Sequence, residues 1–206
     1  MWTGQLLDWM VDEPSHLAGV PGELERLAER HGVDLLHLNL PSQAAGLERP
    51  LPTVVVTHSC MPTWWRAMRK EQMPADWQWR QRLNRVGFLR ASKVVAPSAA
   101  HADLTTNTYD LRTHVAVVHN GMSGTFEGGV KQPVILAAGR WWDEGKNARL
   151  LDEAALGLKW PVLMAGGLRG PDGQCVEIRH GQAVGAIDHA DLLQRMRSAS
   201  IVVSPS

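Results

Sequence analysis

The residues best suited to chemistry are two cations, Arg140 and Lys146, in the segment 139–147, which reads GRWWDEGKN. An apolar run, 133–138, precedes this segment, and a run with spaced apolar residues, 150–156, follows it. The first pattern is typical of a buried strand and the second of a helix, so both cations are expected on the loop between them. Ligands of open α/β sheets bind at the carboxyl edge of the strands, and cations beside a helix N-terminus suit a diphosphate. The alternative is a solvated loop whose charges have no role.

Expected strands and helices alternate along the whole chain, and one such strand and helix flank this loop. We expect strands at 33–38, 53–57, 93–96, 114–118, 134–138, 162–165 and 201–203, with a short one near Val176. We expect helices at 16–30, 77–90, from Ser98, at 147–158 and from Asp188, and a loop with one helical turn at 62–74. Unbroken apolar strands that alternate with helices indicate parallel sheets covered on both faces.

This pattern predicts an α/β protein with two Rossmann-like parallel-sheet units. Residues 122–132 contain Gly124, Gly128 and Gly129 and are expected to be a linker. The linker separates a first domain, 1–121, from a second domain, 133–206.

Composition narrows the class of protein. Hydrophobic residues make up 44% of the chain and charged residues 20%, as in ordinary globular proteins, and a formal net charge of zero argues against a nucleic-acid partner. Cys60 and Cys175 have no metal-ligand or redox spacing and fit free thiols in a reducing cytosol. No apolar stretch approaches a membrane span of ~20 residues. The N-terminus lacks the features of a signal peptide. A cytoplasmic protein is therefore expected.

Several segments, in their order and spacing, resemble the family 4 (group 1) glycosyltransferases, enzymes with two Rossmann-like domains in the GT-B arrangement. The matching segments are Thr57-His58-Ser59, Lys93 to Ser98, Val117 to Gly121, Ala138-Gly139-Arg140 with Glu144 to Asn147, and Ser200 to Ser206. The resemblance implies a retaining transfer of a sugar from a nucleoside-diphosphate-sugar donor, with a carbohydrate or lipid-linked acceptor and possible peripheral contact with a membrane.

The resemblance also implies roles for individual residues. Arg140 and Lys146 match the basic pair that binds the donor diphosphate, and His58 would hydrogen-bond the transferred sugar as the catalytic histidine. The donor-binding set is completed by Gly139, Asn147, Gly166 and Gly167, whereas Asn120 and Gly121 are expected at the hinge and cleft floor. Such enzymes typically work without a metal, and the chain has no Asp-x-Asp motif, so no cofactor is expected.

The same comparison leads us to expect a fragment, with both units incomplete. Family members usually open with a strand and a glycine-rich loop, and they continue after the last matching segment into a motif with two glutamates. Two alternatives stay open. One is a truncated GT-B chain that binds a nucleotide or a partner without turnover. The other is a nucleotide-sugar 2-epimerase, for which no acid/base carboxylate set is identified.

Overall fold

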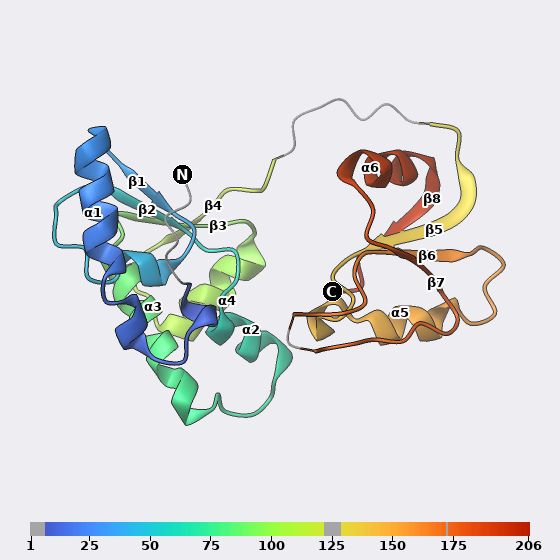
Figure 1. Cartoon of the computed structure of the whole chain (residues 1–206), viewed down its shortest axis with the longest axis horizontal. Helices are drawn as coiled ribbons and strands as arrows, with labels where there is room; N and C mark the ends of the chain where they lie inside the picture. Colours follow the sequence, from blue (N-terminus) through green and yellow to red (C-terminus); the bar gives the residue numbers. More distant parts are fainter. Residues whose placement is uncertain (1–6, 122–128, 172) are drawn as a thin grey trace. The chain divides into compact units, whose positions relative to one another are not determined.

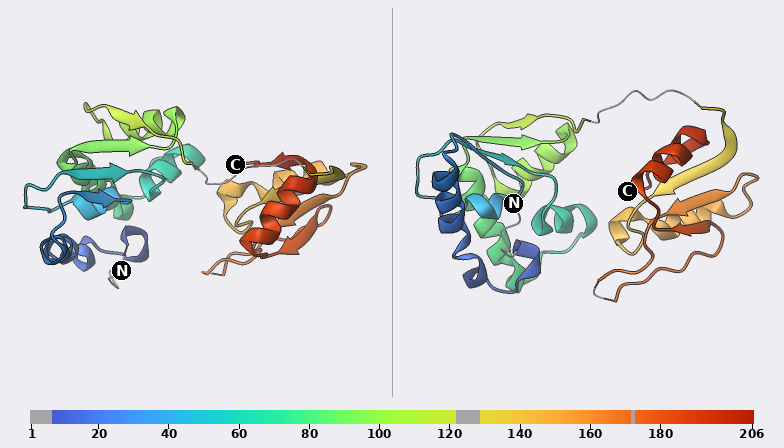
Figure 2. Two further views of the ribbon diagram at one scale, coloured as in Figure 1. Left: turned by 90° about the horizontal axis from the view of Figure 1, so that it is seen from above. Right: turned by 45° about the horizontal axis from the view of Figure 1, so that its top comes forward.

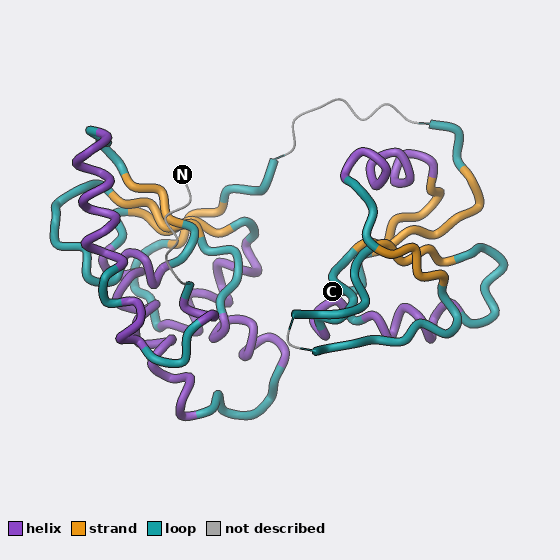
Figure 3. Tube along the Cα trace, in the orientation of Figure 1, coloured by secondary structure: helices purple, strands orange, loops and turns teal. Residues whose placement is uncertain are grey.

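The structure is a computed structural model that describes residues 7–121, 129–171 and 173–206. The chain divides into two compact units, Met1–Met122 and Ser123–Ser206. Each unit contains one four-stranded parallel sheet with helices packed on it (Figure 1; Figure 3). The α/β class with two parallel-sheet units, predicted from the alternation of apolar runs and amphipathic segments, is confirmed. Within the described residues, no helix is both long and apolar enough to cross a membrane.

The sheet of the first unit has its strands in sequence order. These strands are β1 (Leu36–Leu38), β2 (Thr53–Val56), β3 (Lys93–Ala96) and β4 (Val115–Val117), and each is parallel to the next. Helices α2 (Met61–Met68), α3 (Gln78–Arg90) and α4 (Ala99–Tyr109) gather on one side of this sheet, and α1 (Val20–His31) precedes it (Figure 1). Strands laid down in one direction through right-handed connections bring their helices to the same face. We expected helices on both faces of this sheet. This expectation is wrong, because α2, α3 and α4 of the described residues all lie on one face (Figure 1).

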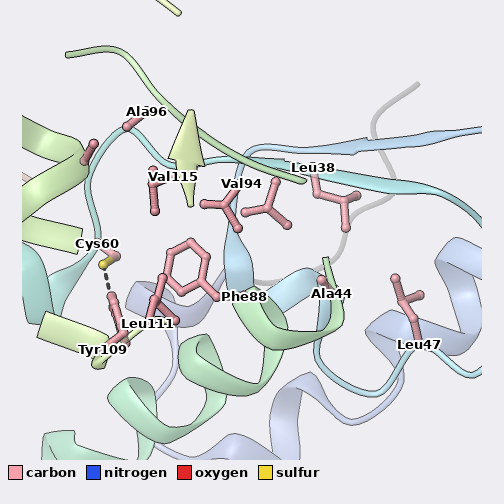
Figure 4. Close-up of a cluster of buried hydrophobic side chains, with 12 residues drawn as sticks. Leu38, Ala44, Leu47, Cys60, Phe88, Val94, Ala96, Tyr109, Leu111 and Val115 are labelled. Atoms are coloured by element: carbon pink, nitrogen blue, oxygen red, sulfur yellow. Dashed lines mark hydrogen bonds between the residues drawn. The ribbon is translucent and has the colours of Figure 1, made fainter. Parts of the chain in front are cut away.

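The core of the first unit lies between the sheet and these helices. The rings of Phe88 of α3 and Tyr109 of α4 are tilted by 59° with their centroids 4.9 Å apart, and they belong to one buried cluster with Val94 of the sheet (Figure 4). Close packing of α3 depends on Gly87, because a Cβ there would lie 1.7 Å from the carbonyl oxygen of Pro41. Short 3₁₀ helices complete the unit at Asp8–Met10, Pro14–Leu17, Pro41–Ala44 and Ala75–Trp77.

In the sheet of the second unit, later strands are added on both sides of the first strand, β5 (Gln132–Ala138). The strand order is β7 (Gln182–Gly185), β6 (Val162–Ala165), β5 and β8 (Ala199–Val203), all parallel. Helix α5 (Ala148–Ala155) connects β5 to β6, whereas α6 (His189–Ser198) leads back to β8 on the other side of β5. The two helices consequently lie on opposite faces of the sheet (Figure 2). The carboxyl ends of β5 and β8 form a topological switch point, where open α/β sheets bind ligands.

Two local predictions are wrong. Residues 62–74, expected as a loop with one helical turn, include the two-turn helix α2, in whose first turn Pro62 is tolerated because the amide it lacks has no partner there. No strand forms near Val176, where only an isolated bridge joins Arg169 and Cys175. The strand that pairs with the outer side of β6 is β7 instead. The sequence did not reveal it because Val184 is its only β-branched residue.

Candidate functional site

The loop that carries Arg140 begins where β5 ends and is held against the loop after β6. Gly139 N–H donates to the carbonyl oxygen of Ala165 at 3.0 Å, and Trp141 N–H donates to that of Gly167 at 3.0 Å. Two backbone hydrogen bonds therefore extend the β5–β6 pairing beyond the strands and fix the start of the Arg140 loop.

Gly166 is required by this close approach of the two loops. Its φ is +123°, and a Cβ at this position would lie 1.9 Å from the carbonyl oxygen of Gly139. Its N–H donates to the carbonyl oxygen of Gly185 at 2.7 Å. This amide is therefore engaged within the protein, and the observed reason for glycine here is backbone packing between β5, β6 and β7.

Lys146 and Asn147 reach across the switch point. Asp143 caps the 3₁₀ helix Glu144–Lys146, because its carboxylate accepts from Gly145 N–H at 3.0 Å. The stem of Lys146 then lies over Gly139, and its Nζ donates to Ser206 Oγ at 3.4 Å. Asn147, in the left-handed region with φ 54°, donates from Nδ2 to the carbonyl oxygen of Pro205 at 3.2 Å. The ends of β5 and β8 are thereby joined by side chains of the candidate site.

Arg140 extends from this loop into solvent. Its guanidinium forms an ion pair with Asp143 at 3.1 Å and lies 5.5 Å from the centroid of the Trp142 ring. The side chain of Arg140 is 67% exposed, and ion pairs of this kind contribute about 0–1 kcal/mol, so a diphosphate can displace the carboxylate at low cost.

The adjacent indoles of Trp141 and Trp142 serve different purposes. Trp141 is buried, and its Nε1 donates to the carbonyl oxygen of Ala165 at 2.8 Å, so it anchors the loop in the core. Trp142 is only partly buried and packs beside Gly170, where a Cβ would lie 2.9 Å from its ring. The sequence pattern did not assign Trp142 to the site, and its contact with Arg140 is what places it there.

A hollow of this unit has neither Arg140 nor Lys146 in its lining. Its volume is about 400 Å³, and Arg149, Asp152 and Arg179 are among the residues that line it. Asp152 is buried and accepts from the backbone N–H groups of Arg179, His180 and Gly181 at 2.8–3.1 Å. Burial raises the pKa of this carboxyl, but the three donors outweigh it and the net pKa is lowered. This arrangement ties the segment 179–181 to α5.

In the first unit, His58 follows β2 and is exposed. The preceding residue, Thr57, is buried, and its Oγ1 lies 3.2 Å from Nε2 of His101 in the first turn of α4. Burial, together with the nearby His58, lowers the pKa of His101. Ser98 caps α4 by accepting from His101 N–H at 3.2 Å, which fixes the backbone of this histidine in the first turn of the helix. The sequence analysis gave His101 no role. The Ser98 cap predicted only that His101 lies in the first turn of a helix.

The turn after His58 is anchored by Cys60. The Sγ atom of Cys60 lies 2.8 Å from the hydroxyl of Tyr109 (Figure 4). The same Sγ atom lies 3.2 Å from the hydroxyl of Thr63, to which Cys60 N–H donates at 3.0 Å. Asn84 Nδ2 donates to the Tyr109 hydroxyl at 3.3 Å. The turn that carries His58 is thus fixed to α2, α3 and α4.

The comparisons with known proteins agree with this architecture. The model of Glycosyltransferase Family 4 matches residues 6–123, which is more than half of the chain. The chain belongs to this family. The structure of sucrose-phosphate synthase from Thermosynechococcus elongatus is similar, with a TM-score of 0.72 and 16% identity over 94% of this chain. The match covers 55% of that protein, so this chain spans just over half its length, and at this identity the likeness shows the GT-B fold alone. No curated protein matches the sequence.

The predicted site residues of this family 4 glycosyltransferase chain fall into two sets. Six lie together on the loops after β5 and β6 of the second unit, namely Gly139, Arg140, Lys146, Asn147, Gly166 and Gly167. The first unit holds His58 after β2, and Asn120 and Gly121 follow β4 as exposed residues. Residues 122–128 of the expected linker lie outside the described residues, and β5 already begins at Gln132.

Proposed function

We propose that this chain transfers a hexosyl group from a nucleoside-diphosphate-sugar donor to a carbohydrate or lipid-linked acceptor, with retention of configuration. The observation that carries the proposal is the pair of cations Arg140 and Lys146 at the β5–β8 switch point. A leaving nucleoside diphosphate gains negative charge in the transition state, and fixed cations stabilise that charge. Membership of the family supports glycosyl transfer in general, and the geometry of the second unit supports the donor class.

The loop is suited to a diphosphate by its rigidity. Backbone hydrogen bonds to the β6 loop hold its start, Asp143 caps its middle, and Lys146 and Asn147 bind the segment after β8. Because these contacts already order the loop, binding costs little additional conformational entropy. We propose that Arg140 leaves Asp143 to bind the diphosphate, and that Lys146 turns from Ser206 to the same group.

Calorimetry with UDP, GDP and ADP, each added separately to the full chain, tests the proposed donor site. We expect at least one of them to bind. Arg140→Ala and Lys146→Ala should each weaken that binding by about 1–3 kcal/mol, as for a charge-assisted contact, which is about 5- to 150-fold in Kd. Arg149→Ala is the matched control, because Arg149 is an exposed cation of the neighbouring helix α5 that lines the hollow beside Asp152. Failure of all three nucleotides to bind, or equal affinity in all variants, would contradict the proposal.

A further inference from the structure

A hollow in the first unit lies along α2 and the segment that follows this helix. Its volume is about 230 Å³. Its walls come from the helices α2, α3 and α4 and from the segment that directly follows α2. The residues that give it chemical character are Trp65, Arg66, Arg69, Lys70, Glu71 and Gln81. All but Gln81 lie within the segment 65–71, so α2 and its C-terminal extension supply most of the hollow.

The walls of this hollow are held by hydrogen bonds to backbone oxygens. Trp65 Nε1 donates to the carbonyl oxygen of Glu71 at 3.0 Å, which closes the segment after α2 onto its own helix. Arg66 donates to the carbonyl oxygen of Asn107 at 2.9 Å, and Gln81 Nε2 donates to that of Thr108 at 2.8 Å. The hollow is therefore formed in advance of any ligand, which lowers the cost of binding.

The charge of the hollow is positive. Three cations, Arg66, Arg69 and Lys70, face one carboxylate, Glu71. The guanidinium of Arg69 lies 5.1 Å and 5.7 Å from the ring centroids of Trp64 and Trp65, within the range of a cation–π contact. A helix C-terminus attracts cations in general, but that effect does not explain a hollow with an indole wall. Cations of this kind bind phosphate and carboxylate groups through paired hydrogen bonds.

We infer that this hollow binds the anionic group of a saccharide, either a phosphate or a carboxylate. Its volume is below the roughly 300–1,000 Å³ of pockets for drug-sized ligands, so it suits one sugar ring with its charged group better than a nucleotide. The indole of Trp65 provides an apolar surface for the ring, and Arg66 and Lys70 provide the countercharge.

The position of the hollow assigns this saccharide as the acceptor, an assignment that rests on the proposed function. Helix α2 begins at Met61, directly after the turn that carries His58. Cys60, Thr63 and Tyr109 fix that turn to the same helix. A ligand bound along α2 is consequently positioned by the element that also positions the predicted catalytic histidine.

Calorimetry at low ionic strength with glucose 6-phosphate, glucuronate and glucose tests this inference on the full chain. We expect glucose 6-phosphate or glucuronate to bind at least about tenfold more tightly than glucose, with an affinity that falls as salt is added. Lys70→Glu should weaken the anionic ligand by about tenfold or more. Arg82→Glu makes the same change of charge at an exposed residue of α3 that does not line the hollow, and it should change Kd by less than about twofold.

The outcomes separate this inference from the proposed donor site. Stronger binding of one anionic sugar, lost in Lys70→Glu and kept in Arg82→Glu, supports the inference and identifies the anion. Equal binding of glucose, no binding of either anionic sugar, or equal loss in both variants would overturn it. If a nucleoside diphosphate binds while neither anionic sugar does, only the inference fails. If an anionic sugar binds as expected and no nucleoside diphosphate does, the proposed function fails and the anion site stands.

Discussion

Replacement of Gly166 by alanine should destabilise the second unit strongly, because two independent costs meet at this residue. The φ of +123° is unfavourable for an L side chain and costs roughly 1–3 kcal/mol. A Cβ would also lie 1.9 Å from the carbonyl oxygen and 2.9 Å from the carbonyl carbon of Gly139. Overpacking of this kind costs about 1–3 kcal/mol, so Gly166→Ala should lose about 2–6 kcal/mol in the free energy of unfolding.

The surrounding backbone cannot easily relax this overlap. Gly139 N–H is bonded to Ala165, Trp141 N–H to Gly167, and Gly166 N–H to Gly185. Moving Gly139 away from a new methyl group would break at least one of these hydrogen bonds, each worth about 0.5–1.5 kcal/mol. Because Arg140 follows Gly139, the same movement should weaken nucleoside-diphosphate binding by the variant.

Two other glycines separate the two costs. Gly157 has a φ of +77°, and a Cβ added there would meet open space, so Gly157→Ala carries the backbone cost alone, about 1–2 kcal/mol. Gly167 has a φ outside the left-handed region and ordinary contacts at 3.8 Å and 3.9 Å, so Gly167→Ala should change stability by less than about 0.5 kcal/mol.

Urea denaturation of the full chain, with amide hydrogen exchange of β5 and β6 as a probe specific to the second unit, measures these differences. The expected order of destabilisation is Gly166→Ala, then Gly157→Ala, then Gly167→Ala. A Gly166→Ala variant as stable as Gly167→Ala would refute the close approach of the two loops, and one equal to Gly157→Ala would refute the overlap with Gly139.

Three further predictions concern single side chains. Asp152→Asn should cost about 1–3 kcal/mol, because the neutral amide loses the charge that strengthens these hydrogen bonds and places an NH2 group where Oδ2 accepts from Arg179 N–H; urea denaturation measures the loss. The folded pKa of Asp152 is lowered, so its contribution should be complete above the ordinary pKa of about 4 and lost as pH falls further, a dependence that Asp152→Asn should lack. Burial raises the pKa of the Cys60 thiol, so iodoacetamide at pH 7–8 should label exposed Cys175 alone; mass spectrometry showing label on Cys60 in the folded chain would contradict this. His58→Ala should slow donor-sugar hydrolysis, measured as nucleoside-diphosphate release, by about 5- to 150-fold at unchanged nucleotide affinity, and a parallel loss of affinity would assign His58 to donor binding instead.

The parts of the fold that follow from local pattern were predictable. The apolar run 133–138 and the cations behind it identified β5 and its loop, and Ser98 and Asp188 cap α4 and α6 as their positions indicate. Helix α2 was missed because its eight residues are too few for a helix that is stable by itself, and packing on α4 stabilises it. The edge strand β7 likewise forms by pairing with β6 rather than by its own propensity.

The site shows the same division between local and distant information. That Arg140 lies on a strand–helix loop is a local property and was predictable from periodicity. That Lys146 reaches Ser206 is a contact across 60 positions of sequence, which exists only because β8 returns beside β5. The return of β8 also creates the switch point that makes this edge a natural place for a ligand. The charge of the candidate donor site therefore comes from one short segment of sequence, whereas its shape depends on the order of the strands. A substitution that preserves both cations and disturbs the β5–β8 pairing should weaken nucleotide binding as much as the loss of one cation.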